Sequence, residues 1–284
     1  MKKLFALLLA FTMSLSLVAC GGNDAAEEAP AEDTATEETT PESDAAYIEG
    51  NGKLVVGITI YEPMNYYDEA GNLTGFDTEF AQAVCDKMGL EAEFQEINWD
   101  TKEIELAGKT IDCIWNGMTI TPDRTANMSI SLPYVKNAQV IVVKADSAYA
   151  STADLVDATL VAEVGSAGEA QIEGEEANAD LAQAEYVGMS KQTDCLMEVK
   201  AGTADAAVLD WTLAKSMVGE GTDFADLKMM EGVELATEEY GIAFRQGSDF
   251  TAKVDEAVKA LVADGTLPAL AEKYGLALAP AIAG

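Results

Sequence analysis

The sequence contains no histidine, and its 17 lysines and arginines are outnumbered by 50 aspartates and glutamates. The absence of histidine excludes imidazole-based acid–base catalysis and removes the commonest metal ligand. The net charge of −33 disfavours binding to nucleic acid and to anionic membrane surfaces. Only four cysteines are present, and none has the spacing of a zinc site or of a C-x-x-C motif. We therefore expect no metal, no cofactor and no nucleic-acid partner.

The chain does contain enough apolar sequence for a folded body. Hydrophobic residues make up 49% of its 284 residues, which is ordinary for a globular protein, so a core can form. A chain of this length can form one large domain or two modest domains.

The first 19 residues begin with two lysines and continue as a short apolar run. The run is too short to be a permanent membrane span, and the pattern predicts a secretory signal peptide. It ends in Leu17-Val-Ala-Cys20, which resembles a bacterial lipobox. That resemblance implies cleavage before Cys20 and lipidation of its thiol. An ordinary signal peptide followed by a chance cysteine is the alternative.

Residues 20–46 contain nine acidic residues and neither a basic nor an aromatic residue. Such a segment cannot bury enough apolar surface to offset its chain entropy, and its like charges favour extension. We expect a flexible acidic tether between the lipidated Cys20 and a folded body that begins at Tyr47. An acidic interaction tail is the alternative.

Two successive series of alternating strands and helices are predicted from the periodicity of the remaining sequence. The first series consists of residues 53–60, 78–88, 91–97, 102–107 and 111–115, and the second of residues 160–164, a helix after Gly168, and residues 186–187, 193–200 and 206–209. A strand at 139–144 lies between the two series, and a strand at 239–244 and helices at about 254–262 and 267–274 follow them. The alternation predicts mainly parallel sheets, and two such sheets facing each other would form one cleft beyond the ends of their strands.

The stretch from Ile111 to Arg124 carries the clearest functional pattern. Its apolar beginning predicts a short buried strand, and Asn116-Gly117 predicts a turn at the end of that strand. Thr121 is expected to be the N-cap of a helix that begins at Pro122, because proline is well tolerated at the first helical position.

Arg124 therefore falls in the first helical turn, where the helix dipole disfavours a cation. We expect a bound anion to hold it there, since a guanidinium can grip a carboxylate through two parallel hydrogen bonds. Pairing of Arg124 with a nearby acid, Asp123 or Asp112, is the alternative.

The same stretch resembles the ligand loop of extracellular amino-acid-binding proteins of ABC importers, the family 3 solute-binding proteins. Further motifs of that family follow in its order along roughly residues 54–274. These motifs are Gly75-Phe-Asp77, Ser129-Ile-Ser-Leu-Pro-Tyr134, Ala201-Gly-Thr-Ala-Asp-Ala-Ala-Val-Leu-Asp210, Tyr240-Gly-Ile-Ala-Phe-Arg245 and Asp264-Gly-Thr266.

The resemblance implies an α/β protein with the two-lobed periplasmic-binding-protein type II fold. Each lobe would be a mainly parallel sheet flanked by helices, and the chain would cross between the lobes twice. Residues 47–136 and 240–284 would form lobe 1, and residues 137–239 would form lobe 2. The crossings near residues 135–138 and 237–240 would form the hinge.

A free α-amino acid presents a carboxylate and an ammonium, so its site requires a fixed cation and a fixed anion. Arg124 is the expected cation. The resemblance assigns the anion to Asp210, whose alternative function is to cap a helix that begins near Trp211. The other ligand-binding positions that the resemblance implies are Asn116, Gly117, Thr119, Ser166, Ala167 and Tyr61.

Some of these positions carry information on the ligand. Relatives often have threonine where Ala167 stands, so one hydroxyl contact is lost there. Tyr61 either covers the ligand's side chain or packs in the core, and Trp99 has the same two alternatives. In several relatives that take cationic amino acids, an acidic residue stands where Ile58 stands here. A polar or neutral amino acid is therefore favoured.

The resemblance implies a substrate-binding lipoprotein without catalytic activity. It would capture a free amino acid and deliver it to the permease subunits of an ABC transporter. It would act as a monomer on the extracellular face of the bacterial cell membrane, held there by its lipid anchor. An enzyme similar to cyclohexadienyl dehydratase and a surface sensor or adhesin are the alternatives.

Overall fold

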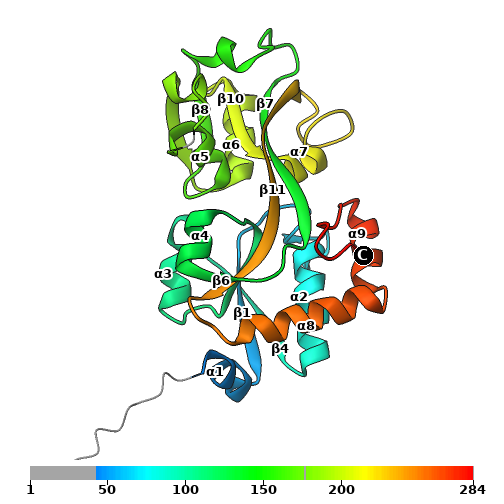
Figure 1. The fold of residues 1–284 in the computed structure, drawn as a ribbon. Helices are drawn as coiled ribbons and strands as arrows, with labels where there is room; N and C mark the ends of the chain where they lie inside the picture. The colour runs from blue at the N-terminus through cyan, green and yellow to red at the C-terminus, as the bar shows by residue number, and fades with distance from the viewer. Residues whose placement is uncertain (1–42, 176, 284) are drawn as a thin grey trace, which may run out of the picture. The chain divides into compact units, whose positions relative to one another are not determined.

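The structure is a computed structural model that describes residues 43–175 and 177–283. The predicted signal peptide, Cys20 and most of the tether lie outside the described residues. The described chain is a mixed α/β protein, as predicted (Figure 1). Its strands are β1 (Lys53–Ile58), β2 (Tyr66–Tyr67), β3 (Leu73–Thr74), β4 (Glu91–Glu96), β5 (Cys113–Thr119), β6 (Met128–Ile130), β7 (Val135–Lys144), β8 (Thr159–Glu163), β9 (Glu185–Met189), β10 (Ala206–Asp210) and β11 (Leu227–Arg245).

Helices flank these strands along the whole described chain. The α-helices are α1 (Asp44–Asn51), α2 (Phe76–Met88), α3 (Lys102–Ala107), α4 (Pro122–Asn127), α5 (Ala167–Glu173), α6 (Gln192–Ala201), α7 (Trp211–Met217), α8 (Phe250–Ala263) and α9 (Thr266–Tyr274). Short 3-10 helices lie at Trp99–Thr101, Thr152–Leu155 and Leu181–Gln183.

The main sheet has the strand order β4-β1-β5-β11-β7-β10-β8-β9. Strands β4, β1 and β5 are parallel, and we call them, with β6 and helices α1 to α4, α8 and α9, the first section. Strands β10, β8 and β9 are also parallel, and we call them, with α5 to α7, the second section. The predicted fold class, with mainly parallel strands and flanking helices in both halves, is confirmed.

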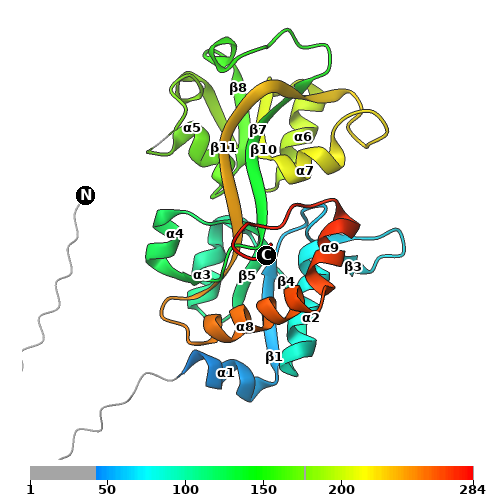
Figure 2. The ribbon, with the colours of Figure 1, turned by 45° about the vertical axis from the view of Figure 1, so that its right-hand side comes forward.

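The long strands β7 and β11 join the two sections and run alongside each other between them (Figure 2). They are antiparallel, and Val135 pairs with Tyr240 while Ala138 pairs with Thr237. The two segments predicted as hinge crossings are therefore hydrogen-bonded neighbours in one ladder. The division into lobes at these residues stays a prediction.

Strands β5 and β11 are both longer than predicted. Asn116 and Gly117 do not end the strand in a turn. They lie inside β5, where Gly117 has a φ of +57°. A Cβ atom at this position would lie 2.5 Å from Cε1 of Tyr61, so only glycine fits without a shift.

The folded body also begins earlier than predicted. Helix α1 starts at Asp44, with Ser43 as its N-cap, so the last residues of the predicted tether are helical. Ala45 is buried in the core, and Asp44 forms an ion pair of 2.6 Å with Arg245. This contact spans 201 residues of sequence, which is why local composition gave no sign of it.

Helix α2 begins at Phe76, two residues before the predicted start, with Gly75 as its N-cap, so Asp77 lies inside the helix. The Asp77 carboxylate accepts hydrogen bonds from the Gly117 backbone N–H (2.7 Å) and from the Tyr134 hydroxyl (2.9 Å). The early Gly-Phe-Asp motif therefore fixes the backbone of β5 where that strand reaches the candidate site.

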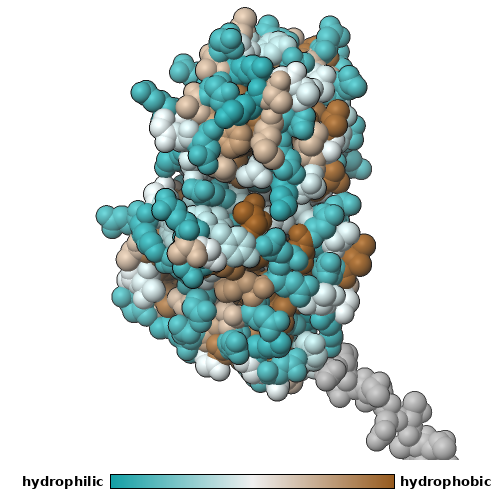
Figure 3. All heavy atoms as spheres, turned by 180° about the vertical axis from the view of Figure 1, so that it is seen from behind, coloured by the Kyte–Doolittle hydropathy of each residue, from teal (hydrophilic) through white to brown (hydrophobic). Residues whose placement is uncertain are grey.

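The surface is mainly hydrophilic. In Figure 3, hydrophobic residues on the visible face form only separated groups. None of the helices within residues 43–175 and 177–283 combines the length and apolar character of a membrane span. The three cysteines of this region, Cys85, Cys113 and Cys195, are buried free thiols.

Candidate functional site

All eight residues predicted to bind a ligand line one small cavity between the two sections of the sheet. Its lining is Tyr61, Trp99, Asn116, Gly117, Thr119, Arg124, Glu163, Ser166, Ala167, Gln192 and Asp210. Only about 10 Å³ of the cavity is accessible to the centre of a water molecule, which is room for about one water. The described conformation is therefore closed around the site, and an amino acid could enter only after the walls separate.

Arg124 lies in the first turn of α4, as predicted, where Thr121 caps the helix by accepting from the Arg124 backbone N–H. The guanidinium is buried and donates to two backbone carbonyl oxygens, Thr119 O (2.8 Å) and Gly165 O (3.0 Å). Burial lowers the pKa of Arg124 from its usual value.

The alternative pairing of Arg124 with a nearby acid does not occur within the described part of the chain. Asp112 instead forms an ion pair with Arg245, and Asp123 accepts from the side chain of Asn127. The guanidinium can therefore exchange its bond to a carbonyl oxygen for a bond to a ligand carboxylate without breaking an ion pair.

Asp210 lies at the carboxyl end of β10 and is buried. It occupies the N-cap position of α7 but makes no side-chain capping bond, so the alternative capping function is not realised. Its carboxylate instead accepts hydrogen bonds from Asn137 (2.5 Å), Gln139 (2.8 Å), Tyr240 (3.0 Å) and Gln192. Burial raises the pKa of Asp210.

Asn116, Gly117 and Thr119, which were predicted to lie in a loop, are part of β5 and differ in which polar groups are already hydrogen-bonded. The Asn116 amide donates to Thr59 O (2.8 Å) and to Asn65 (2.7 Å), and the Gly117 N–H donates to Asp77. The Thr119 hydroxyl donates to Glu238 (2.9 Å) on β11. Asn116 and Gly117 therefore shape the wall, whereas Thr119 presents a hydroxyl that is bonded to an acid.

Ser166 and Ala167 lie where β8 turns into α5. Ser166 is the N-cap, and its hydroxyl accepts from the backbone N–H of Glu169 (3.1 Å). Ala167 is the first helical residue, so its N–H is one of the helix-terminal donors without an intrahelical partner. The site thus combines a helix N-terminus with the nearby guanidinium.

Tyr61 packs in the core, which is one of its two predicted alternatives, and covering of the ligand's side chain stays a prediction. Its ring is buried in the main core cluster and also lines the cavity. Its hydroxyl is hydrogen-bonded to Thr212 in the second section and to Tyr240 (2.6 Å). Trp99 likewise lines the cavity and packs in a smaller core cluster.

Sequence reasoning missed several charged and polar residues of the site. Glu163 and Gln192 line the cavity, and Lys102 donates to Gly165 O (3.0 Å), the same carbonyl oxygen that Arg124 contacts. Glu163 ends β8 as Asp210 ends β10, so the rule that ligands bind beyond strand ends could have found it. No local pattern marks Lys102, whose contact with Gly165 spans 63 residues.

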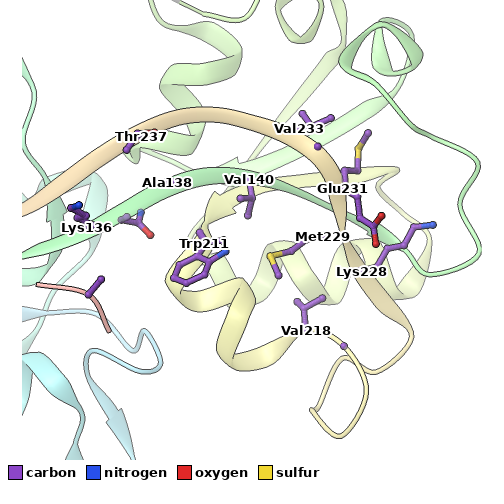
Figure 4. Close-up of a pocket in the computed structure, with 15 residues that line it drawn as sticks. Lys136, Ala138, Val140, Trp211, Val218, Lys228, Met229, Glu231, Val233 and Thr237 are labelled. Atoms are coloured by element: carbon purple, nitrogen blue, oxygen red, sulfur yellow. The ribbon is translucent and has the colours of Figure 1, made fainter. Parts of the chain in front are cut away.

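A larger hollow of about 830 Å³ lies between α7 and strands β7 and β11 (Figure 4). Trp211, Val140, Val218 and Met229 project into it. This lining is mainly apolar, its charged side chains are Lys136, Lys228 and Glu231, and none of the eight predicted ligand-binding residues belongs to it. The small cavity around Arg124 and Asp210 is therefore the candidate site.

The sequence pattern of a known family, described as bacterial extracellular solute-binding proteins, family 3, matches residues 54–277. The chain belongs to this family. Among relatives, the arginine-binding extracellular protein ArtP of Bacillus subtilis is 29% identical over 277 residues, which cover 96% of this chain and 98% of ArtP.

Solved structures of amino-acid-binding proteins are also similar to this chain. A mutant of the arginine-binding protein ArgBP of T. maritima is 32% identical, with a TM-score of 0.74 and coverage of 82% of this chain and 99% of ArgBP. The ancestral amino-acid-binding protein AncCDT-1, described as a precursor of cyclohexadienyl dehydratase, is 29% identical, with a TM-score of 0.72 and coverage of 82% and 99%.

Proposed function

We propose that this family 3 solute-binding protein captures one free amino acid in the cavity around Arg124 and Asp210. The single observation that carries the proposal is the convergence of all eight sequence-predicted ligand residues on one cavity. The functions of ArtP and ArgBP as amino-acid-binding proteins support the same class of ligand.

In this proposal the two charges hold the parts that all amino acids share. The Arg124 guanidinium binds the α-carboxylate, assisted by the free backbone N–H of Ala167 at the start of α5. The Asp210 carboxylate binds the α-ammonium. Because Arg124 belongs to the first section and Asp210 to the second, the ligand bridges them and stabilises closure of the cleft.

The proposal includes the predicted lobes and hinge. Residues 47–136 and 240–284 move against residues 137–239 about the paired crossings of β7 and β11. The closed monomer docks on the permease subunits of an ABC importer and releases its amino acid there. The name of one relative, the ABC transporter glutamine-binding protein GlnH of Bacillus subtilis, supports such a partner.

Ligand binding is tested by a thermal-shift screen against the twenty amino acids and cystine, followed by calorimetry. A ligand at 100 times its dissociation constant should add roughly 2.7 kcal/mol to the free energy of unfolding. Arg124→Glu should abolish binding, and Asp210→Asn should weaken it by roughly 100-fold, because each leaves one ligand charge without its partner. Lys87→Glu, a charge reversal at a surface ion pair, is the matched control.

A second candidate function is a dehydratase-like enzyme, because the cavity contains an acid suited to proton donation. Burial raises the pKa of Glu163 to about 8, so its carboxyl group is largely protonated at neutral pH, as a general acid requires. The test is incubation of the protein with prephenate or arogenate. The absence of any aromatic product excludes this function, whereas a product that disappears in Glu163→Gln establishes it.

A further inference from the structure

Glu163 is an unexpected acid in the wall of the candidate site. It ends β8, is 4% exposed and lines the cavity. Gln192 also lines the cavity, donates from its amide nitrogen to Asp210 and accepts from the Asp210 backbone N–H. Glu163 and Asp210 therefore face the same small cavity.

A third carboxylate, Glu238, shares two hydrogen-bond donors with Asp210. Asn137 donates to both Asp210 (2.5 Å) and Glu238 (2.6 Å), and Gln139 donates to both as well, at 2.8 Å in each case. Asp210 and Glu238 are thus joined by two amide side chains, and the charge of Asp210 also acts on Glu163. Repulsion between Asp210 and each of the other two acids disfavours full ionisation of this group of three acids.

The cations beside this group do not balance it. Arg124 and Lys102 supply two positive charges, against three acids when all are ionised. A zwitterionic amino acid adds no net charge, so one of the three acids must stay protonated for the sum to be zero. An amino acid with a net charge of +1 makes the sum zero.

We propose that the ligand is an amino acid with a positively charged side chain and that Glu163 is the residue that selects it. The inference rests on the proposed function, since it assumes that Arg124 and Asp210 hold the α-carboxylate and α-ammonium. Glu163 is then the remaining cavity-lining carboxylate and accepts from the side-chain cation. The opposite charge and the hydrogen bond offset part of the cost of ionising a buried carboxyl group.

The surroundings of Glu163 agree with this assignment. The charged and titratable groups that act on it are Asp210 from β10, Lys102 from α3, and Asp194 and the Cys195 thiol from α6. The pKa of Glu163 is raised to about 8, first by burial and then by Asp210. A ligand cation beside it lowers that pKa and releases a proton, whereas a neutral ligand does not.

The sequence-based preference for a polar or neutral ligand depended on Ile58. That side chain is 1% exposed and packs in the main core cluster, and it is not one of the residues that line the cavity. An acid at position 58 is therefore not the only way to place a carboxylate beside the ligand's side chain. In this chain Glu163 approaches the cavity from the second section instead.

The test compares arginine with citrulline, which has nearly the same shape but no side-chain charge. Calorimetry with the unmodified protein at pH 7.5 should show roughly 10- to 100-fold tighter binding of arginine. Repeating the titration in buffers of different ionisation enthalpy should show proton release with arginine and not with citrulline. Equal affinities, or tighter binding of citrulline, would overturn the proposal.

Variants separate this inference from the proposed function. In Glu163→Gln the ratio of arginine affinity to citrulline affinity should fall by about tenfold or more, because the cation loses a charged partner whereas a neutral side chain keeps a hydrogen-bond acceptor. Glu185→Gln, at the exposed start of β9, should leave both affinities unchanged. An unchanged preference in Glu163→Gln removes Glu163 as the selecting residue. If no amino acid binds the unmodified protein at all, the proposed function itself fails.

Discussion

The Arg124 guanidinium donates a hydrogen bond of 3.0 Å to the carbonyl oxygen of Gly165, 41 residues away in the second section. The same oxygen accepts from Lys102 at 3.0 Å, so two cations of the first section hold one backbone oxygen of the second. In the proposed function a ligand carboxylate takes the place of this oxygen at Arg124. The carbonyl contact therefore competes with the ligand for the guanidinium.

This competition leads to a prediction for the protein without ligand. Lys102→Met removes one of the two cation–carbonyl bonds to Gly165 and should shift the population towards an open form. Small-angle X-ray scattering should then give a larger radius of gyration than for the unmodified protein. Lys87→Met, which removes an ion pair within the first section, is the control and should give no increase. The same radius in both variants would contradict a holding function for Lys102.

A second prediction concerns the backbone of β5 at Gly117. Gly117→Ala combines a φ of +57° with a Cβ placed 2.5 Å from Tyr61, whose hydroxyl contacts Tyr240 and Thr212. Gly89→Ala has a similar φ of +72° but no atom within 4 Å of the new Cβ, so it measures the backbone cost alone, about 1 kcal/mol. Urea unfolding should show a clearly larger loss in the free energy of unfolding for Gly117→Ala than for Gly89→Ala. Equal losses would mean that the Tyr61 ring moves aside freely.

A third prediction concerns the attachment of α1 to the body. Arg245 bonds Asp44 (2.6 Å) and the buried Asp112 (2.9 Å), and its side chain is 12% exposed. Arg245→Met leaves Asp112 without its cation and should lower the free energy of unfolding by about 3 kcal/mol. Lys53→Met, which breaks a solvent-exposed pair with Glu93, should change little. Comparable losses of stability in the two variants would show that the buried Arg245–Asp112 pair stabilises the fold no more than the exposed Lys53–Glu93 pair.

The predictable part of this structure is the part fixed by local patterns. Helix α3 begins at Lys102 and ends at Ala107 as expected, and Thr121 caps α4 as expected, because caps and apolar periodicity act within one or two helical turns. Strand β11 was predicted only from about residue 239. Its first half is partly exposed and contains Gly232, so it lacks the apolar alternation that marks a buried strand.

The residues of the candidate site also fall into those that a local sequence pattern marks and those that it does not. Arg124 and Asp210 could be chosen because each follows a recognisable motif at a strand end. Lys102 and Glu238 could not be chosen from the sequence, because their partners lie far along the chain. Lys102 contacts Gly165. Glu238 accepts hydrogen bonds from Asn137 and Thr119. Contacts of this kind depend on how β7 and β11 bring the two sections together.

A fourth prediction concerns residues that the structure does not describe. We propose that residues 1–19 are a signal peptide and that lipidation of Cys20 anchors the protein on the extracellular face of the cell membrane, since each buried methylene of an acyl chain adds roughly 0.8 kcal/mol. In bacteria fed labelled palmitate, the unmodified protein should carry label and sediment with membranes. Cys20→Ala should carry none and appear in the soluble fraction. Labelling of Cys20→Ala would place the lipid elsewhere.

The last prediction concerns pH and Asp77. This carboxyl group is fully buried, and burial raises its pKa from 3.8 to about 7. Between these two values the folded protein keeps a proton that the unfolded chain has lost, so the free energy of unfolding falls as pH rises from about 4 to about 7. The upper limit of this loss is roughly 4 kcal/mol, from 1.36 kcal/mol for each pKa unit.

Asp77→Asn resembles the protonated acid and keeps an acceptor for Gly117, so it should lose much less stability over this range. Urea unfolding at pH 4.5 and pH 7.5 measures how much of the free energy of unfolding each protein loses over this range. The general repulsion within a strongly acidic chain affects the variant and the parent alike, so it cancels in the comparison. Asp264→Asn is the control. Lys87 and Thr266 lower the pKa of Asp264 to about 2, so that group is already ionised in both states over the measured range. If Asp77→Asn and the parent lose the same stability, Asp77 is ionised in the folded protein and the Gly117 bond is charge-assisted.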